Sequence, residues 1–316
     1  MIKQLLSTSL LGIALAATFA HAERQSVDET RAVQSDGFVR IAVVRGNLKV
    51  EGWDRDEIRV RGELDERTRE FIFDVQDENA FIEVRLPRSM NSWCCEDGSD
   101  LTIQVPTGSH VDVTVVSTDV TASNLTGSLK VGSISGDVRV SQADNRVDLT
   151  SVSGDLHLHA ATGRIELRSV SGDLDAAGLN GTVRLQTVSG DIDARDSGEE
   201  LVIESVSGDI DVVDLRFSRL SGHTVSGDSE ILGELIEDGS LEFDSVSGSI
   251  RVGFKGNVNA RFDVETGSGS IRNRISRDKP VASKYVRDET LRFVVGDGTG
   301  EVILSTRSGD IVISRD

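Results

Sequence analysis

The sequence predicts an all-β fold, a parallel β-solenoid (β-helix) with coils of about 18 residues. The first observation behind this prediction is a turn motif, rich in serine and glycine, that recurs at a fixed interval. It occurs as SISGD at Ser133, as SVSGD at Ser151, Ser169 and Ser205, and as TVSGD at Thr187, with neighbouring copies 18 residues apart. A fixed period of this length is typical of repeat proteins, in which each repeat packs against its neighbours.

Aliphatic residues between the turns recur at the same interval and alternate with polar residues. Alternation with a period of two indicates strands, with one side of each strand facing inward. Recurrence every 18 positions indicates that each coil lies on the next, at the parallel-strand spacing of about 4.8 Å. Four aliphatic columns run through the five coils, and two of them are Leu129, Val147, Ile165, Val183, Leu201 and Ile134, Val152, Val170, Val188, Val206.

Each turn contains a glycine at the position where the chain changes direction. Glycine allows a tight corner where a side chain would clash, and the neighbouring serines can satisfy backbone groups of the corner. We therefore interpret the motif as structural, and we expect the later coils to be less regular because the interval lengthens to 19 after Gly208 and to 21 after Gly227. The structural turn positions are Gly136, Gly154, Gly172, Gly190, Gly208 and Gly227.

Residues 1–22 have the pattern of a secretory signal peptide. Lys3 supplies a positive charge, an apolar run follows from Leu5 to Ala17, and Ala20-His21-Ala22 fits a cleavage site with small residues. The run is too short for a permanent transmembrane helix. We therefore expect an exported protein of a Gram-negative bacterium, either periplasmic or at the cell surface or secreted.

The remaining chain divides into two parts by its repeat pattern. Residues 23–116 alternate apolar and polar residues without the 18-residue period, so we expect a β-rich N-terminal module that caps the open end of the solenoid. Residues 117–316 are the predicted solenoid repeats, interrupted at about 271–290 by a basic loop insertion and completed by a closing coil. The basic residues of this candidate partner loop are Arg272, Arg274, Arg277, Lys279, Lys284 and Arg287.

The charge balance and the cysteine content exclude several classes of protein. The chain has 53 acidic and 34 basic residues and a net charge of −19, which repels nucleic acid and anionic lipid and attracts cations. The acidity also keeps a β protein with exposed edges soluble. Cys94 and Cys95 are the only cysteines and are adjacent, so they form neither a disulfide framework nor a four-cysteine zinc site. They are either a loop pair, reduced or bridged, or a redox or dimer-forming site.

Stacked aspartates form a candidate cation-binding ladder. Carboxylate oxygens suit Ca²⁺, but the same aspartates can instead accept hydrogen bonds from serine hydroxyls and backbone N–H groups, and the calcium β-roll motif is missing. His157 and His159 share an outer face and could hold a metal, but a metal site needs a third or fourth ligand, so solvated surface histidines are the favoured interpretation. We therefore predict no cofactor and assign no metal. The ladder residues are Asp173, Asp175, Asp191, Asp193, Asp209 and Asp211.

The sequence carries no recognisable catalytic motif. GxSxG, the Walker loop and HExxH are absent, and Gly296-Asp297-Gly298-Thr299-Gly300 leads into a predicted strand, so it reads as a β-turn and not a phosphate loop. A polysaccharide-active enzyme is the alternative, because β-helices host that chemistry, but aromatic residues for sugar stacking are scarce. We predict that the protein is not an enzyme.

Four features of the sequence form a specific combination: Gly-Trp-Asp at Gly52, Val-Pro-x-Gly at Val105, the serial VSGD turns and the terminal TRSGDIVIS. Together they resemble the putative adhesin domain family, a domain of unknown function in bacterial envelopes. The resemblance extends from about Phe38 to the end of the chain. It implies an exported β-strand-repeat scaffold without established catalytic residues.

From these observations we predict an exported, non-enzymatic binding or scaffold protein of the cell envelope that is adhesin-like. The alternative is a periplasmic structural or envelope-stress accessory protein that binds another envelope protein, for example through the basic loop. A polysaccharide-active enzyme is the third hypothesis. The expected partner is a protein or glycan of the envelope or the outside surface, and the solenoid ends could also self-associate.

Overall fold

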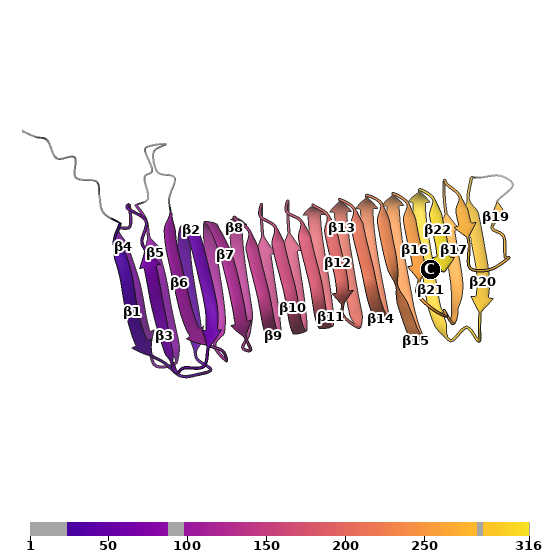
Figure 1. Ribbon diagram of the computed structural model, residues 1–316. Helices are drawn as coiled ribbons and strands as arrows, with labels where there is room; N and C mark the ends of the chain where they lie inside the picture. Colours follow the sequence, from indigo (N-terminus) through magenta and orange to yellow (C-terminus); the bar gives the residue numbers. More distant parts are fainter. Residues whose placement is uncertain (1–23, 88–97, 283–286, 316) are drawn as a thin grey trace, which may run out of the picture.

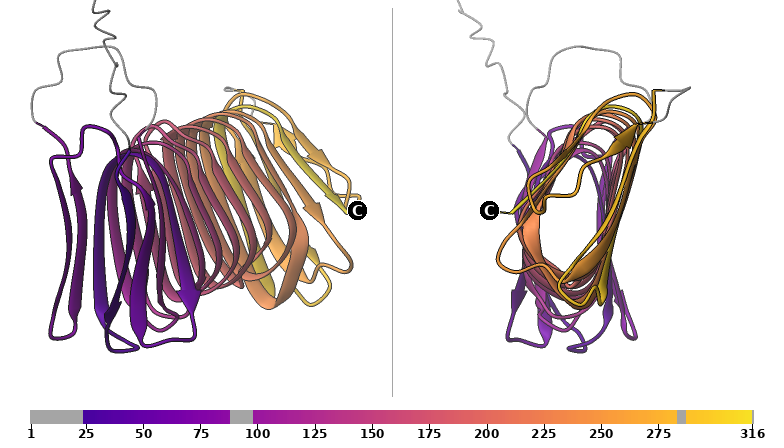
Figure 2. Two further views of the ribbon diagram at one scale, coloured as in Figure 1. Left: turned by 60° about the vertical axis from the view of Figure 1, so that its left-hand side comes forward. Right: turned by 90° about the vertical axis from the view of Figure 1, so that its right-hand side faces the viewer.

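The repeat folds into one long stack of β-coils, which confirms the predicted all-β solenoid (Figure 1). The computed structural model describes residues 24–87, 98–282 and 287–315, and in these ranges every regular element is a strand. Each coil is a flattened loop with two long sides (Figure 2). The apolar side chains between the two sides form one continuous core.

The central coils follow one another in sequence order and pair in parallel. Leu156 of β10 lies between Val138 of β9 and Leu174 of β11, which are its partners 18 residues away on either side. Between β14 and β15 the register shifts at two places, and the additional residues lie there, so the lengthened intervals are absorbed locally. The central strands are β7 (His110–Leu125), β8 (Leu129–Ser135), β9 (Val138–Ser151), β10 (Leu156–Ser169), β11 (Leu174–Ser189), β12 (Ile192–Ser197), β13 (Glu200–Ser207), β14 (Ile210–Ser226), β15 (Ser229–Ser247) and β16 (Ile250–Phe254).

Three of the four aliphatic columns face the core, and the fourth lies outside. Leu167, Leu185 and Ile203 are fully buried, as the alternating pattern predicts. Val170 and its equivalents in the other coils are about half exposed. The alternation places Ser169 inward after Leu167, and the next residue, Val170, then points outward.

The corner glycines are required because neighbouring coils approach closely there. A Cβ atom at Gly190 would lie 2.3 Å from the carbonyl oxygen of Gly172, and one at Gly208 would lie 2.1 Å from the carbonyl oxygen of Gly190. Carbon and oxygen atoms that are not bonded do not approach this closely. Gly208 also has a φ of +133°, which disfavours any other residue.

The order of the strands at the N-terminal end differs from their order in the chain. β2 pairs in parallel with β7 on one side, and with β5 and then β6 on the other. The coil made of β5 and β6 therefore lies outside β2, although it follows β2 in the sequence. Antiparallel strands then close the end, β3 on β6, β1 on β3 and β4 on β5. The bounds are β1 (Ser26–Ala32), β2 (Phe38–Trp53), β3 (Glu57–Glu63), β4 (Glu70–Gln76), β5 (Asn79–Arg85) and β6 (Ser99–Pro106).

The C-terminal end shows a similar inversion, which corrects the expectation of a closing coil. The last strands of the chain form a coil, but β21 lies between β15 and β17, and β22 lies between β16 and β18. The end of the stack is covered by β20, antiparallel to β17, and by β19 beside it. The rings of Phe262 and Phe293 stack there with centroids 4.4 Å apart. The bounds are β17 (Ala260–Thr266), β18 (Ile271–Asn273), β19 (Val281–Ala282), β20 (Glu289–Val295), β21 (Gly300–Ser308) and β22 (Ile311–Arg315).

Three predicted features fall on residues outside the described ranges: the signal peptide up to residue 22, the Cys94-Cys95 pair and Lys284. Within the described ranges, no helix is long and apolar enough to cross a membrane. The GDGTG segment joins β20 to β21, where the N–H of Gly298 donates to Oδ1 of Asn259 at 2.8 Å. The segment therefore leads from one strand into another.

Candidate functional site

The aspartates that follow the corner glycines form a continuous column joined by hydrogen bonds. The backbone N–H of each aspartate donates to the carboxylate of the aspartate one coil earlier, for example Asp209 to Oδ1 of Asp191 at 2.8 Å. The chain of bonds continues to the N–H of Ser249, which donates to Asp228 at 2.8 Å. We call this set the turn column: Asp119, Asp137, Asp155, Asp173, Asp191, Asp209 and Asp228.

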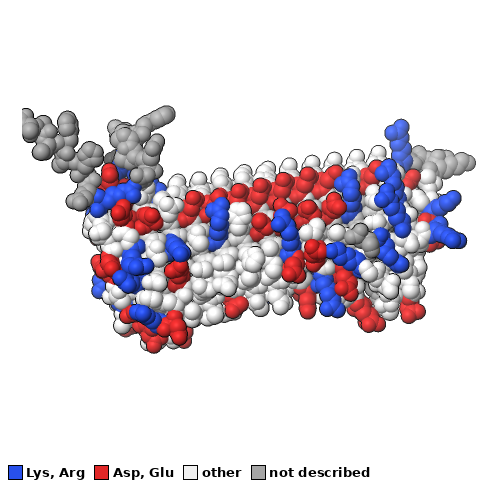
Figure 3. Space-filling model, in the orientation of Figure 1, with Lys and Arg blue, Asp and Glu red and all other residues white. Residues whose placement is uncertain are grey.

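A second acidic column lies beside the turn column, two residues further along each coil. It contains Asp175, Asp193, Asp211 and Glu230, which are paired in register on adjacent strands. The two columns together make an acidic strip, visible as rows of red atoms along one face of the stack (Figure 3). All six predicted ladder residues lie in this strip.

Sequence reasoning missed Asp228 and Glu230, which extend the strip by one coil. The signal was present, because GDSE at 227–230 repeats the pattern of GDID at 208–211. The interval between the two segments is 19 residues instead of 18, so a search for residues exactly 18 positions apart does not find Asp228 and Glu230.

The electrostatic environment changes along the strip. Burial raises the pKa of Asp211, and the neighbouring charges of Asp193 and Glu230 raise it further, against a smaller opposing effect of Arg195. For Asp137, burial also acts to raise the pKa, but the N–H of Asp155 and the guanidinium of Arg139 outweigh it and hold the pKa below its ordinary value. The middle of the strip thus has an excess of negative charge, whereas its beginning is compensated.

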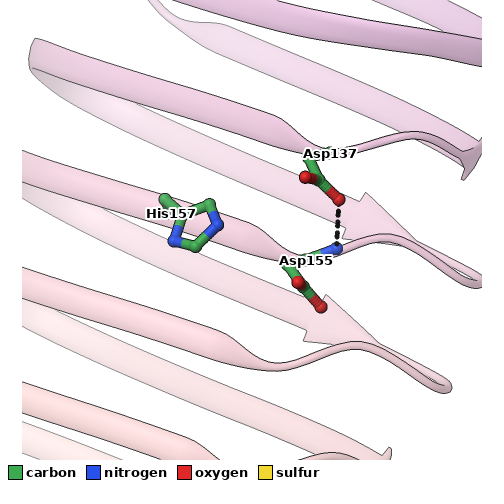
Figure 4. Close-up of side chains that lie close together, drawn as sticks. All are labelled: Asp137, Asp155 and His157. Carbon is green, nitrogen blue, oxygen red and sulfur yellow. Dashed lines mark hydrogen bonds between the residues drawn. The ribbon is translucent and has the colours of Figure 1, made fainter.

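The six predicted ladder carboxylates do not gather into a group that could hold a metal ion. In the described part of the chain, only one group of three acidic or histidine side chains brings its ligand atoms within 4.8 Å of one another: Asp137, Asp155 and His157 (Figure 4). This group contains none of the six predicted ladder residues. The candidate cation-binding ladder, whose residues are all described, is therefore a row of carboxylates along the stack that brings no three ligand atoms together.

The group of Asp137, Asp155 and His157 offers the oxygen and nitrogen atoms that a transition metal prefers. However, both oxygens of Asp137 are already engaged. Oδ1 accepts the N–H of Asp155 at 3.2 Å, and Oδ2 accepts a hydrogen bond from Arg139 at 2.9 Å. A metal bound by Asp137 would therefore share a carboxylate oxygen with the backbone N–H or with the guanidinium. His159, the other predicted histidine, lies exposed two residues further along β10.

The exposed aliphatic column forms a ridge along the corner of seven consecutive coils. Its side chains are between 39% and 53% exposed. A groove of about 790 Å³ runs beside four of them, with Ser169, Thr187 and Ser205 among its lining residues. We call this column the valine ridge: Ile134, Val152, Val170, Val188, Val206, Val225 and Val246.

The predicted partner loop lies at the C-terminal end of the stack, where blue atoms gather in Figure 3. Arg272 belongs to β18 and forms an ion pair with Asp310 at 3.5 Å. Asn273 organises the segment that follows, because its side chain accepts the N–H groups of Ile275 and Ser276. The other described basic residues of this segment are exposed: Arg274, Arg277, Lys279 and Arg287.

Three comparisons with known proteins bear on this architecture. The Toastrack DUF4097 family model matches residues 40–199 and 182–314. No curated protein matches the chain. Solved structures similar to it include a putative cell adhesion protein from Clostridium sporogenes ATCC 15579, with 11% identity over 92% of this chain and 100% of that one and a TM-score of 0.22.

Two other similar structures are a lipid binding protein and an adhesin, both putative by their descriptions. A putative lipid binding protein from Parabacteroides distasonis ATCC 8503 is 11% identical over 91% of this chain and 96% of that one, with a TM-score of 0.39. A putative adhesin from Bacteroides fragilis NCTC 9343 is 12% identical over 93% and 98%, with a TM-score of 0.35. The family model covers most of the chain, including the serial turns and the acidic strip, and the chain therefore belongs to the Toastrack DUF4097 family.

Proposed function

We propose that this protein is an exported, non-enzymatic scaffold of the cell envelope that binds a partner through its repetitive outer faces, as an adhesin does. One observation carries the proposal: consecutive coils present the same outward series of an aliphatic residue, serine, glycine and aspartate at one corner. A surface that repeats at a fixed spacing suits an extended partner, because identical contacts add along the stack.

The sequence supports export through the pattern of residues 1–22. The family resemblance supports a binding role outside the cytoplasm. The arrangement of side chains supports binding over catalysis, because the acidic strip holds its carboxylates in separate coils. Activity against a panel of uronate polymers tests the enzyme alternative, and turnover of any of them would overturn a purely binding role.

The deciding experiment for the location is protease accessibility on intact cells, with a tagged copy and a periplasmic control protein. Digestion from outside while the control stays intact supports surface display. Protection until the outer membrane is opened contradicts surface display and favours the periplasmic accessory role.

The periplasmic alternative rests on the basic segment at the C-terminal end. Deleting residues 271–290 is a poor test, because Ile271 pairs with β22 and its N–H donates to Glu289. Charge reversal of Arg274, Arg277 and Lys279 leaves these bonds in place. Capture of the partner that survives this reversal would contradict a role for the segment.

A further inference from the structure

The corner that carries the valine ridge and the turn column has the features of a binding site for one kind of partner. We propose that it binds a cationic amphipathic helix of about 20 residues, lying along the axis of the stack. This inference rests on the proposed scaffold function and names the chemistry of the partner.

The length and spacing of the ridge fit a helix. The six spacings of about 4.8 Å between seven consecutive coils give a ridge of about 29 Å. A helix that rises 1.5 Å per residue spans this distance in about 20 residues, and its apolar stripe repeats about every 5.4 Å. Each turn of the helix can therefore meet the side chains of one or two coils. An extended strand could not add backbone hydrogen bonds here, because the strands of each coil already pair with the coils on both sides.

The apolar part of the corner is extensive for a free surface. The ridge side chains lie in consecutive coils without an interruption, and each remains about half exposed. The groove beside the ridge continues the apolar surface around Val170, Val188 and Val206. Contiguous exposed apolar surface of this kind marks an interaction site.

Two buried hydroxyls in the groove also lack a partner within the described part of the chain. Ser151 and Ser169 accept the N–H of Gly154 and Gly172, at 2.9 and 2.8 Å. The hydroxyl groups of Thr187 and Ser205, which occupy equivalent positions in the next two coils, make no such bond. Both line the groove, and a buried polar group without a partner is energetically unfavourable.

The negative charge beside the ridge indicates that the partner carries positive charge. In each central coil one serine and one glycine separate the ridge residue from the aspartate of the turn column, as in Val188-Ser189-Gly190-Asp191. One oxygen of Asp191 accepts a backbone N–H, and the other stays available. Five members of the column form no ion pair with any described residue: Asp119, Asp155, Asp173, Asp191 and Asp209.

These carboxylates favour lysine or arginine on one flank of the helix and disfavour the other candidate occupants. A second copy docked with its ridge antiparallel to this one would bring two acidic columns together, and an anionic lipid surface would be repelled. On the opposite side of the ridge the charges are mixed, with Arg168, Glu204 and His223 along the groove. The basic residues of the helix should therefore lie mainly on the flank that faces the turn column.

The experiment measures binding of a fluorescent Leu/Lys peptide of about 20 residues, designed as an amphipathic helix, to the exported chain by fluorescence anisotropy. A peptide of identical composition in scrambled order is the first control. The ridge variant is Val170→Thr with Val188→Thr and Val206→Thr, which keeps β-branched residues. The column variant is Asp173→Asn with Asp191→Asn and Asp209→Asn, which keeps an oxygen that accepts the backbone N–H. The matched charge control is Glu237→Gln with Glu265→Gln and Glu301→Gln, at exposed positions that do not line the groove.

We expect binding to weaken by about tenfold or more in each of the first two variants and to stay unchanged in the matched control. It should also weaken for the scrambled peptide and in high salt, which screens exposed charges. Circular dichroism and melting of each variant check that it folds like the parent protein.

Four outcomes would overturn the inference. They are no binding, equal binding of the scrambled peptide, an equal loss in the matched charge control, and a ridge-dependent dimer in light scattering, which would assign the ridge to a second copy. Binding of a fluorescent fatty acid that depends on the ridge but not on the column, without peptide binding, would assign the groove to acyl chains. None of these outcomes changes the result of the protease experiment, so failure of this inference is distinguishable from failure of the proposed function.

Discussion

The central coils and the C-terminal end of the stack are built from similar strands that are connected differently. In the centre, Leu156 pairs with Leu174, its equivalent in the next repeat of the chain. At the end, Leu241 of β15 pairs with Val302 of β21. Strand β21 thus lies between β15 and β17, although both precede it in the sequence. A central coil therefore packs wherever its register matches that of its neighbours. Each strand of the C-terminal end, in contrast, depends on particular partner strands.

The N-terminal end supports the same distinction. There the coil of β5 and β6 lies outside β2, which comes earlier in the chain, and antiparallel strands cover it. A stack of parallel coils exposes unpaired backbone groups at both ends, which would otherwise pair with other chains. Antiparallel caps solve this problem at both ends, and their strands do not follow the repeat.

The largest effect should follow from removing the last coil. Truncation before Gly300 removes Val302, Leu304, Ile311 and Ile313, all buried, and separates β17 and β18 from the stack. At about 1.5–3 kcal/mol for each buried side chain, the loss approaches the whole stability of an ordinary domain. We expect residues 260–299 to become sensitive to protease and the melting transition to fall or broaden, as followed by limited proteolysis and circular dichroism.

The matched control deletes one central coil, residues 156–173, which has the length of one repeat. Leu174 then follows Asp155 and takes the place of Leu156 against Val138. We expect a folded protein whose stability changes by about 2 kcal/mol or less, since neighbouring repeats contribute nearly additively. Equal damage from the two deletions would contradict the distinction between the centre and the end.

Substitutions of the corner glycines should have a smaller effect on stability. They allow the two regions to be compared, because a similar clash occurs in both. Gly190→Ala places a Cβ 2.3 Å from a carbonyl oxygen in the middle of the stack, and Gly269→Ala places one 2.0 Å from Gly309 in the last parallel coil. Overpacking costs about 1–3 kcal/mol. We expect the upper value for Gly190→Ala, which has coils on both sides, and the lower value for Gly269→Ala.

Urea unfolding measures both values. The control is Gly132→Ala, where the new Cβ would find its nearest neighbour at 4.0 Å. It should be neutral or stabilise by about 0.5 kcal/mol. A larger loss for Gly269→Ala than for Gly190→Ala would mean that the end is the more rigid region.

The period of the sequence accounts for how much of this structure could be predicted. Leu167, Leu185 and Ile203 recur in register and alternate with polar residues, so their place in the core could be predicted. The outward position of the valine ridge could also have been predicted from the alternation, which places Ser169 inward and Val170 outward. Because valine is apolar, it was instead assigned to an aliphatic column of the solenoid. The position of the coil that contains Val302 could not be predicted. Its strand β21 lies between β15 and β17, but the sequence would show the same alternation of apolar and polar residues if the coil lay at the end of the stack.

The candidate site was predictable to the same extent. The regular period located Asp173 and Asp175, whereas Asp228 fell outside it because one extra residue enters near Asp214. The partners of His157 were missed for a different reason. They are Asp137 and Asp155. In the repeat, His157 aligns with Arg139, and the two aspartates lie two residues earlier in their coils, in a neighbouring column.

Hydrogen bonds of the aspartates give the next test. Asp191→Ala removes the acceptor of one backbone N–H in the centre. Asp310→Ala at the end removes the acceptor of both the N–H and the hydroxyl of Ser270, at 2.9 and 3.0 Å. We expect losses of about 1 kcal/mol and about 2 kcal/mol in urea unfolding. The Asn variants keep an acceptor oxygen and should lose less. Equal losses for Ala and Asn at either position would contradict a role for these bonds.

The smallest effect concerns charge in the centre of the acidic strip. Burial, together with Asp193 and Glu230, raises the pKa of Asp211 above its ordinary value of 3.8. The charged form is therefore less favourable in the folded protein than in the unfolded chain, and stability is lost as the pH rises from 3.8 through the raised pKa. Asp211→Asn should consequently stabilise by about 0.5 kcal/mol at pH 7, a value typical of exposed charges, and the gain should disappear below pH 3.8.

Asp310 at the C-terminal end should show the opposite pH dependence. The N–H and hydroxyl of Ser270 lower its pKa, so its contribution to stability is present above 3.8 and is lost as the pH falls through the lowered value. Asp310→Asn should therefore destabilise at pH 7 and approach the parent protein in acid. Melting temperatures of both variants between pH 3 and pH 8 measure this contrast. A gain from Asp211→Asn that persists in acid would show that the stabilisation comes from packing, because no charge remains there to be relieved.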